Sequence, residues 1–559
     1  MALVPGVVPG AQHEGAIEPL VAQLEGGGWT QDRGYELLLA ITTVARSGAG
    51  GALKDIALRD RVVAALCNLC KQQLGPPLRR RLAEAMCALI DAEGRAVLPI
   101  VDGVILILET ITALASGKTA TVAAGGGARV TGLACLERVL AHIGYQASSR
   151  LPALLAICRA AVKPGEAPQV RVRGARALIA GIGASEQAGR GSHEECLKLV
   201  KTLLADKMGA VRLASADLLL AVVQAAPQPH ELYAEKLLTI LAASLDTPGS
   251  GSMGGVPAEV SGGDEGARAE ARCFASVLGK ALGVLALADP PPPEPSARVK
   301  MSGFRKRKHI IGVDGALAFL RAAFLAARPA SEARVSLARA LRALIGTIAR
   351  SAGEVEVTTA GVVGVVLDLA VSSGGKAPFF AARHTACCVG EALGTARAFS
   401  EEAQQQLART LLAEIATRTR EPASRDIPGQ ALAVTCAVHE LTRVLLDLSG
   451  TPPDPEHLAL LLPLLDSPFA PLRAAAAVAV RALVSAAPAL TVPAMRALLD
   501  VLHSDAAAHA DATSEHTHGA CLAIASVMMS ARTHTHGLPC ELLDSVMSLA
   551  HILVRMSSG

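Results

Sequence analysis

Aromatic side chains are scarce in this sequence. Phenylalanine, tyrosine and tryptophan together make up 2% of the 559 residues, whereas hydrophobic residues make up 51%, mostly alanine, leucine and valine. Strands are enriched in aromatic and β-branched residues, so this composition argues against a protein built mainly from sheets. Small apolar side chains instead suit helices that pack closely together. The composition therefore predicts an all-α protein.

The chain also lacks an excess of charge of one sign. Its 53 lysine and arginine residues nearly balance its 50 aspartate and glutamate residues, and the formal net charge is +3. A protein that binds nucleic acid or anionic lipid mainly by electrostatics carries a strong basic field. The net charge therefore indicates no nucleic-acid partner, and by itself it names no other partner.

Signals for secretion or membrane insertion are missing as well. The amino terminus, MALVPGVVPGAQHEG, has no basic segment. The most apolar helical run, Val101–Ala115, contains Glu109 and is shorter than the ~20 residues that span a bilayer. The twelve cysteines lie mostly inside apolar helical runs and do not form a short secreted framework. We therefore expect no secretion, no membrane span, and a reducing, cytosolic setting.

A helical pattern is most complete from Leu204 to Pro227. Asp206 is suited to cap the start of a helix, because its carboxylate can accept hydrogen bonds from free backbone amides, and Pro227 ends the pattern. Two apolar stripes recur at helical spacing, one formed by Val211, Ala214, Leu218 and Val222 and the other by Leu219 and Val223. A helix with two apolar stripes must be covered on two sides. This stretch therefore predicts a buried helix within a stack.

Similar patterns recur along the chain. Asp206 and Arg212, six residues apart around Val211, match the Asp and Val-Arg positions in the second helix of a HEAT repeat. The arginines interpreted as equivalent to Arg212 are Arg173, 39 residues earlier, and Arg272, Arg334 and Arg473. A single compact core stops growing at roughly 250–300 residues, so a chain of this length with recurring helices favours a stacked array. We predict an all-α, HEAT/armadillo-type α-α superhelix (solenoid) of about ten helix pairs.

Breaks in the helical pattern divide the chain into six segments. Two of these are too rich in Gly, Pro and Ser to offset their ordering entropy by burial. In chain order, we expect an irregular segment with one or two helices (1–52), HEAT-like repeats (53–245), a Gly/Ser-rich disordered insert (246–266), a HEAT-like helix (267–288), a Pro-rich basic insert (289–313) and HEAT-like repeats (314–556). The last pairs show no polar capping repeat, which predicts that the protein is longer or that another surface covers this end.

Two short motifs invite a chemical function, but neither has the surroundings that the function needs. The tripeptide GKT at 117–119 resembles the end of a phosphate-binding loop, yet Thr112 stands where that motif requires a glycine and no strand precedes it. Cys67 and Cys70 form a C-x-x-C pair inside an apolar helix, with no second pair at zinc-finger distance. The first motif therefore favours a loop over a nucleotide site, and the second favours core packing.

Histidines are concentrated in the carboxyl-terminal part of the chain. They are His503, His509, His516, His518, His534, His536 and His551, with Cys521 and Cys540 among them. Imidazole and thiolate groups can bind zinc, but His516 and His518 are two residues apart and so lie on different faces of a helix. A basic run, RKRK at 305–308, is typical of a nuclear import signal, an anion-binding patch or a solvated loop tip. We favour no metal site and a loop tip, with the other interpretations left open.

No group of residues has the spacing of a catalytic site. No Ser, His and Asp set occurs in a nucleophile-elbow context, and His439-Glu440 lacks the second histidine of a zinc-protease helix. We therefore expect neither enzymatic activity nor a cofactor.

The order of the helical segments resembles the amino-terminal part of the HEAT-repeat-containing protein 5 family, which includes the yeast clathrin-adaptor accessory protein and the plant protein Sweetie. The similar segments are GPPLRRRLAEAMCALI at 75–90, LADKMGAVRLASADLLL at 204–220, VLGK at 277–280, the stretch 304–324, AARHTACCVGEALG at 381–394, CAVHELTRVLL at 436–446 and the helix at 471–488. They span most of residues 75–555, and their order carries the resemblance. The two inserts and the histidine-rich tail have no counterpart in that pattern.

The resemblance implies a non-catalytic cytosolic protein that works with the clathrin adaptor complex of the trans-Golgi network and endosomes. Its role would be retrograde endosome-to-Golgi transport and endocytic sorting, peripheral to Golgi and endosomal membranes. The implied partners are the adaptor complex or its accessory proteins, and we also consider self-association. The alternatives are a generic HEAT scaffold, similar to a nuclear import receptor or a phosphatase regulatory subunit, and an enzyme that turns over nucleotide at 117–119.

Overall fold

The computed structural model contains helices and no strand in the residues that it describes. These are residues 17–47, 55–115, 122–163, 165–183, 190–225, 265–287, 312–374, 379–394, 398–420, 427–448, 455–508, 514–530 and 538–557. The helices form two compact units, Met1–Pro229 and His230–Gly559, and each unit is considered by itself.

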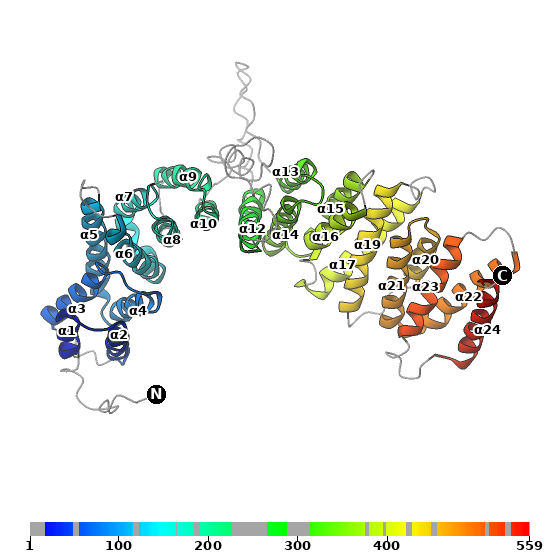
Figure 1. Cartoon of the computed structure of the whole chain (residues 1–559), viewed down its shortest axis with the longest axis horizontal. Coiled ribbons are helices and arrows are strands. Elements are labelled where there is room, and N and C mark those ends of the chain that lie inside the picture. The colour runs from blue at the N-terminus through cyan, green and yellow to red at the C-terminus, as the bar shows by residue number, and fades with distance from the viewer. Residues whose placement is uncertain are drawn as a thin grey trace, which may run out of the picture. The chain divides into compact units, whose positions relative to one another are not determined.

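The first unit is built from consecutive helix pairs (Figure 1). The first helices of its pairs are α1 (Ile17–Glu25), α3 (Ile56–Leu69), α5 (Val97–Ala115), α7 (Leu151–Ala161) and α9 (Arg190–Leu204). The second helices are α2 (Gln31–Arg46), α4 (Pro76–Ala92), α6 (Val122–Ile143), α8 (Pro168–Gly183) and α10 (Gly209–Ala225). Short 3-10 helices, η1 (Gly94–Ala96) and η2 (Gly144–Arg150), precede α5 and α7.

The second unit repeats this arrangement. Its first helices are α13 (Val313–Ala326), α15 (Ala360–Gly374), α17 (Glu401–Thr419), α20 (Glu456–Leu461) with η5 (Leu462–Asp466), and α22 (Thr491–Ala508). Its second helices are α14 (Glu332–Ala352), α16 (Phe379–Leu393), α19 (Pro428–Asp447), α21 (Ala470–Ala486) and α23 (Ser514–Ser530). Contacts with α14 and α22 place α12 (Glu265–Leu287) and α24 (Cys540–Ser557) beside these pairs, and η3 (Glu356–Thr358) and η6 (Pro488–Leu490) lie in turns.

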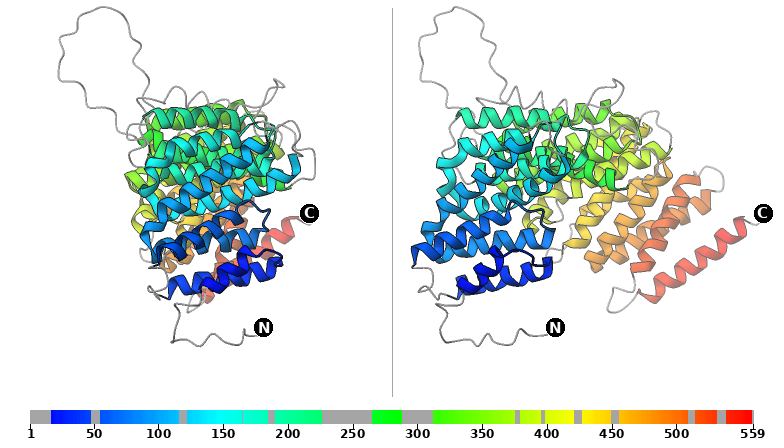
Figure 2. Two further views of the ribbon diagram at one scale, coloured as in Figure 1. Left: turned by 90° about the vertical axis from the view of Figure 1, so that its left-hand side faces the viewer. Right: turned by 60° about the vertical axis from the view of Figure 1, so that its left-hand side comes forward.

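Within each unit the helices form two layers, which we call the first-helix layer and the second-helix layer (Figure 2). Each second helix packs against the second helix of the next pair, and α12 joins the second-helix layer through α14. Ten helix pairs lie within the described residues. The prediction of an all-α, HEAT/armadillo-type solenoid is confirmed.

The two predicted inserts lie almost entirely outside the described residues. The helix expected at 267–288 is α12, which begins at Glu265, and the repeats expected from 314 begin with α13 at Val313. The irregular amino-terminal segment expected at 1–52 contains α1 and α2.

Several helix starts and ends follow from local chemistry. The side chains of Thr30 and Asp55 accept hydrogen bonds from the backbone amides of Arg33 and Ala57, at 3.3 and 2.9 Å, and so cap α2 and α3. Prolines occupy the first turn of α4, α7, α19 and α21, where a missing N–H removes no helical hydrogen bond. Gly353 follows α14 with φ of +111°, a conformation that a side chain would disfavour.

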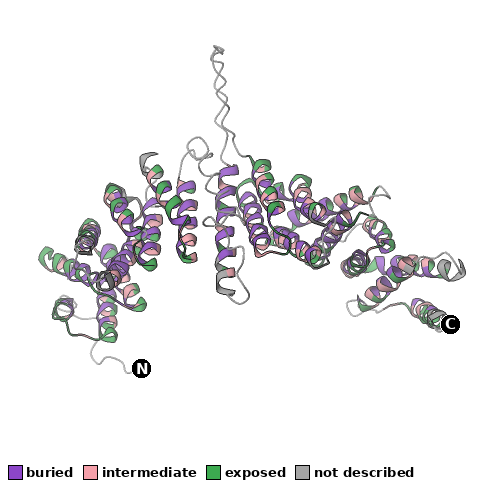
Figure 3. Cartoon of the chain, turned by 45° about the horizontal axis from the view of Figure 1, so that its top comes forward, coloured by how far each residue is buried: buried purple, intermediate pink, exposed green. Residues whose placement is uncertain are grey.

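The second helices bury the same positions in successive repeats. Counted from one apolar residue in the first two turns, the residues 4, 5, 7, 8, 11 and 12 positions later are buried in α4, α6, α8, α10, α14 and α21. We call this apolar residue the counting residue; it is Leu78, Ala128, Val170, Val211, Ala333 or Leu472. The six positions form two adjacent stripes, which bury each second helix on two sides. Figure 3 shows buried residues on the packed faces and exposed residues on the free faces.

Helices α12 and α14 pack backbone against backbone at a glycine. A Cβ atom placed on Gly279 would lie 2.2 Å from the carbonyl oxygen of Ala340 and 2.8 Å from its Cα atom. Because these are backbone atoms, no side-chain rotation can relieve the overlap. The close packing of these two helices therefore depends on Gly279.

We predict that Gly279→Ala lowers the free energy of unfolding of the second unit by about 1–3 kcal/mol, because α12 must move away from α14. The measurement is the midpoint of thermal or guanidinium unfolding. Gly126→Ala in α6 is the matched control, because a Cβ there meets nothing within 4 Å. It is expected to leave the midpoint unchanged or slightly raised. Equal midpoints for wild type and Gly279→Ala would contradict the close approach.

Candidate functional site

An arginine follows the counting residue directly in most second helices. With Ala271 as the counting residue of α12, these arginines are Arg79, Arg129, Arg171, Arg212, Arg272, Arg334 and Arg473. Three of them reach an acid at or just before the start of the next second helix, in the pairs Arg129–Glu166, Arg171–Asp206 and Arg272–Glu332. These ion pairs join neighbouring repeats near the amino-terminal ends of the second helices.

Asp206, one of the predicted residues, is held through both of its carboxylate oxygens. Its carboxylate contacts the guanidinium of Arg171 and accepts a hydrogen bond from the backbone amide of Met208 at 2.9 Å. Both charged side chains are nearly buried, with 7% of Asp206 and 10% of Arg171 exposed. The acid therefore shapes the turn before α10 and links that turn to α8.

Arg171, rather than the predicted Arg173, is the structural counterpart of Arg212. The buried positions of α8 coincide with those of α10 at an offset of 41 residues, not at the 39 residues inferred from the sequence. Both arginines of α8 fit the sequence pattern, and only burial separates them. Arg173 is half-exposed and pairs with Glu137 of α6, with 2.7 Å between Nη1 and Oε2.

Arg212 lies beside Asp206, as expected, but it contacts the backbone of Asp206 rather than the carboxylate. Its Nη1 donates hydrogen bonds to the backbone carbonyl oxygens of Asp206 and Lys207, both at 2.9 Å. The carboxylate of Asp206 is engaged by Arg171 instead. The other predicted positions of α10, Val211, Leu218 and Leu219, are fully buried.

Arg272 and Arg334 have contrasting surroundings. Arg272 makes a two-point contact with Glu332, with 2.5 Å from Nε to Oε1 and 3.2 Å from Nη2 to Oε2. Arg334 is 4% exposed; it donates to the carbonyl oxygen of Ala327 at 3.2 Å and to Oγ1 of Thr385 at 3.4 Å. Its guanidinium lies 5.0 Å from the ring centroid of Phe324. Burial lowers the pKa of Arg334 below its ordinary value.

Arg473 joins α21 to α23 through a histidine. Its Nη1 donates to the carbonyl oxygen of Ser467 at 2.6 Å, and its Nε donates to Nδ1 of His518 at 3.1 Å. His516 of the same helix lies 3.1 Å from Asp466, measured from Nε2 to Oδ1. Both histidines of α23 therefore contact the preceding repeat.

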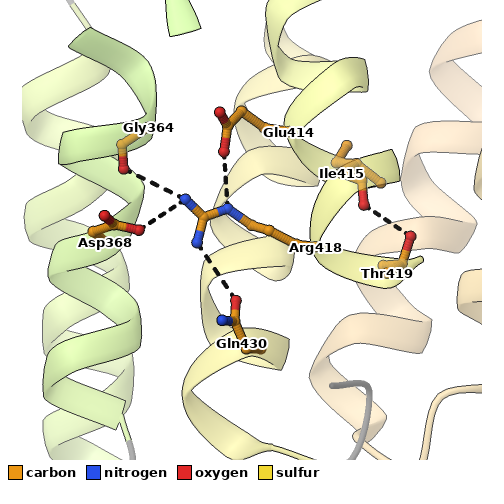
Figure 4. Close-up of polar contacts among 7 residues, drawn as sticks. All are labelled: Gly364, Asp368, Glu414, Ile415, Arg418, Thr419 and Gln430. Atoms are coloured by element: carbon orange, nitrogen blue, oxygen red, sulfur yellow. Dashed lines mark hydrogen bonds and ion pairs between the residues drawn. The ribbon is translucent and has the colours of Figure 1, made fainter. Parts of the chain in front are cut away.

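The sequence pattern missed one link, which is made by a first helix. Arg418 of α17 contacts Asp368 of α15 at 2.9 Å and Glu414 at 3.0 Å, and it donates to Oε1 of Gln430 at 3.4 Å (Figure 4). Gln430 follows Gly429, from which the usual six buried positions of α19 can be counted. Glutamine thus stands at the usual arginine position, and Arg418 supplies a guanidinium from the neighbouring helix. No second-helix pattern could have indicated it.

The C-x-x-C pair is packed in the core. Cys67 and Cys70 are both buried, and Sγ of Cys67 lies 3.8 Å from the carbonyl oxygen of Ile100. Burial raises the pKa of Cys67 to about 12. A hydrogen bond with Cys135, together with burial, raises the pKa of Cys70 well above its ordinary value. These thiols are held protonated, which makes them poor ligands and poor nucleophiles.

Buried thiols predict a loss of stability in alkaline solution. Burial raises the pKa of Cys158 and Cys436 from 9.0 to about 12, so the folded state favours the neutral thiol. The unfolded chain releases these protons from about pH 9, so the stabilisation is complete below about pH 9 and is lost between about pH 9 and pH 12. Thermal unfolding across this pH range should show a smaller decline in Cys158→Ala/Cys436→Ala than in wild type. Cys273→Ser/Cys540→Ser, at two exposed cysteines, is the control, and an identical decline in all three proteins would contradict the prediction.

Several sequence motifs lie outside the described residues: GKT at 117–119, RKRK at 305–308, and His509, His534 and His536. In the described part of the chain, no group of three or more His, Cys, Asp or Glu residues is placed to hold a metal ion. None of the helices in those same ranges is both long and apolar enough to cross a membrane.

The free face of the second-helix layer differs between the two units. Positions 2, 6 and 9 after the counting residue point away from the buried stripes, because each residue turns a helix by about 100°. In the first unit the charged residues at these positions are of both signs, namely Arg80, Glu84, Glu137, Arg176 and Asp217. In the second unit, with Ala381 as the counting residue of α16, these positions carry Lys280, Arg339, Arg342, Arg383 and Arg481. The three corresponding positions of α19 are buried, but its exposed Arg443 reaches α16, where Nη1 lies 3.2 Å from a Cβ placed on Gly390. We call these six cations the basic face.

No protein-family model and no curated protein matches the chain. Among solved structures, it is similar to a Kap121p mutant at 12% identity and a TM-score of 0.44, covering 98% of this chain and 52% of that chain. It is also similar to the Kap95:Nup1 complex at 12% identity and a TM-score of 0.45, covering 95% of this chain and 65% of that chain. An engineered protein matches at 16% identity and a TM-score of 0.30, covering 84% of this chain and 98% of that chain. At these identities and TM-scores, the similarities carry no argument about function.

Proposed function

We propose that the chain is a non-catalytic helical-repeat scaffold in vesicle trafficking. Its role would be that of an accessory protein of the trans-Golgi and endosomal clathrin adaptor complex, in retrograde endosome-to-Golgi transport and endocytic sorting. The observation that carries this proposal is the order of helical segments along residues 75–555, which resembles the HEAT-repeat-containing protein 5 family.

The fold supports the scaffold part of the proposal. Stacked helix pairs present continuous helical surfaces, and repeat proteins use such surfaces to bind partners. The predicted residues Asp206 and Arg272 form ion pairs with Arg171 and Glu332 of the neighbouring helices, and these pairs join repeats. The proposed partners are adaptor subunits or their accessory proteins, or a second copy of the chain, and the proposed location is the cytoplasmic surface of Golgi and endosomal membranes.

The test is affinity purification of the tagged protein from cells, with mass spectrometry and fluorescence imaging. We expect clathrin-adaptor subunits or their accessory proteins among the recovered proteins, and puncta that overlap Golgi or endosomal markers. The variant Leu218→Asp, which is expected to unfold the first unit, serves as the control for non-specific capture by unfolded chain. Recovery of nuclear import factors or phosphatase subunits, with a diffuse or nuclear distribution, would overturn the trafficking role and leave a generic HEAT scaffold.

A further inference from the structure

The basic face is a cluster of cations that is not apparent from the small net charge of the whole chain. Its six members belong to five successive second helices, α12, α14, α16, α19 and α21. The acids beside it are Glu391, which contacts both Arg339 and Arg342, and Glu440, which is 1% exposed beside Arg443. The face therefore has a strong excess of positive charge, whereas the equivalent face of the first unit is mixed.

Four of these cations lie at the same height along the axes of the stacked second helices. Lys280, Arg342 and Arg481 each stand nine residues after the counting residue of their helix. In α16 the residue nine positions after its counting residue, Ala381, is Gly390, and a Cβ placed there would lie 3.2 Å from Nη1 of Arg443. Arg443 of α19 thus reaches across to the same level on α16. Equivalent positions of stacked repeats lie side by side, so these cations form a row across the helices.

Internal ion pairs account for only part of this charge, at Arg339, Arg342 and Arg443. Among the described residues, Lys280, Arg383 and Arg481 have no ion-pair partner. Like charges on neighbouring helices repel one another, so the row costs folding stability unless a partner neutralises it. This cost points to a function in binding an anionic partner.

We propose that the basic face binds an extended, acidic segment of a protein partner, a proposal that rests on the scaffold function above. Neighbouring helices are ~8–10 Å apart, which equals one turn, three residues, of an extended polyproline II chain at ~3.1 Å each, so that every third side chain faces the row. The bound segment therefore carries an acid at about every third residue, and about 12–15 residues of it cross the five helices. Val277, Cys387 and Val478 lie between the cations and contact the apolar residues of the segment.

The chemistry of the face favours a peptide over nucleic acid. Proteins that hold single-stranded nucleic acid stack its bases on aromatic side chains. The residues at positions 2, 6 and 9 of α12, α14, α16 and α21 are cationic, aliphatic, thiol or glycine, and none is aromatic. Aliphatic side chains between cations suit a segment in which acidic and apolar residues alternate.

The test measures binding of a fluorescent peptide of about 15 residues, a repeat of Glu-Ser-Val, to the full chain by anisotropy. The decisive variant is Lys280→Glu/Arg383→Glu/Arg481→Glu, because these cations have no ion-pair partner to lose within the described ranges. We expect it to weaken binding about tenfold or more. The matched control is Arg80→Glu/Arg138→Glu/Arg176→Glu, which reverses three exposed cations on second helices of the first unit and should leave binding unchanged. A peptide with the same composition but contiguous glutamates should bind more weakly, because its acids cannot match the row.

Thermal unfolding and circular dichroism establish that both triple variants are folded. Equal loss of peptide binding in both variants, or no binding by wild type, would overturn the proposal. Tighter binding of wild type to an oligothymidylate of similar length, or to phosphatidylserine vesicles, would also overturn the proposal if only the decisive variant loses that binding. The basic face would then bind nucleic acid or a membrane.

This experiment separates the proposal from the trafficking function. If wild type binds the peptide but recovers no adaptor component from cells, the trafficking role fails and the acidic-segment site stands. If the decisive variant recovers adaptor components as well as wild type does, and peptide binding is absent, the basic face fails and the trafficking role stands.

Discussion

Replacement of Leu218 by aspartate is expected to unfold α10 and the helix pairs around it. Leu218 is completely buried, as is its neighbour Leu219, and α10 packs against both α8 and α9. An unpaired carboxylate in such a site costs several kcal/mol, and loss of the leucine side chain adds about 2–5 kcal/mol. Because the total stability of a domain is about 5–15 kcal/mol, this single change is enough to unfold the first unit.

The measurement is hydrogen exchange with mass spectrometry, together with the amplitude of the unfolding transition. Peptides from α8, α9 and α10 should lose protection in Leu218→Asp. Peptides from the second unit should keep more of theirs, because each repeat of a solenoid is stabilised by its neighbours. Gln224→Glu, an exposed position on the same helix, is the control and should change the unfolding midpoint little. An unchanged profile for Leu218→Asp would show that α10 is not part of the core.

Asp206→Ala is expected to lower the free energy of unfolding of the first unit by about 3–5 kcal/mol. The change leaves the guanidinium of Arg171, of which 10% is exposed, without its carboxylate. It also removes the oxygen that accepts the amide hydrogen of Met208 at 2.9 Å, before the start of α10. Removing one member of a buried ion pair is costly because the remaining charge stays desolvated.

The double variant Arg171→Met/Asp206→Ala tests this explanation. It should recover a large part of the loss, because no unpaired charge remains in the interior. Glu137→Gln is the control, since its pair with Arg173 is 28% and 31% exposed and is expected to contribute about 0–1 kcal/mol. A double variant no more stable than Asp206→Ala would assign the effect to the lost amide contact instead.

The sequence by itself determined the class of fold and the stripes that each helix buries. In α10, the apolar spacing that begins at Val211 is set by the 3.6-residue turn of a helix, whatever lies beside it. A helix with two apolar stripes, such as that of Leu218 and Leu219, can only be covered by neighbours on two sides, and successive helices of the chain are the nearest neighbours available. The solenoid follows from local periodicity and recurrence.

Only the tertiary structure decided which charged groups meet. Arg171 and Arg173 fit the sequence pattern equally, and the packing of α8 on α10 selects Arg171 for Asp206. Arg418 lies on a first helix, outside any second-helix pattern, and reaches Gln430 only because α17 packs on α19. A side chain's partner depends on the offset between neighbouring helices, and that offset is set by the fit of their surfaces rather than by either sequence alone.

The basic face, likewise, could not be predicted from the amino-acid composition. A net charge of +3 is a sum over the whole chain, and it carries no information about where the charges lie. Lys280 and Arg481 are 201 residues apart in sequence, and the stacking of α12 to α21 places them at one level of the same layer. The periodicity of each helix fixed which way its cations point, and the stacking of the repeats alone brought them onto one surface.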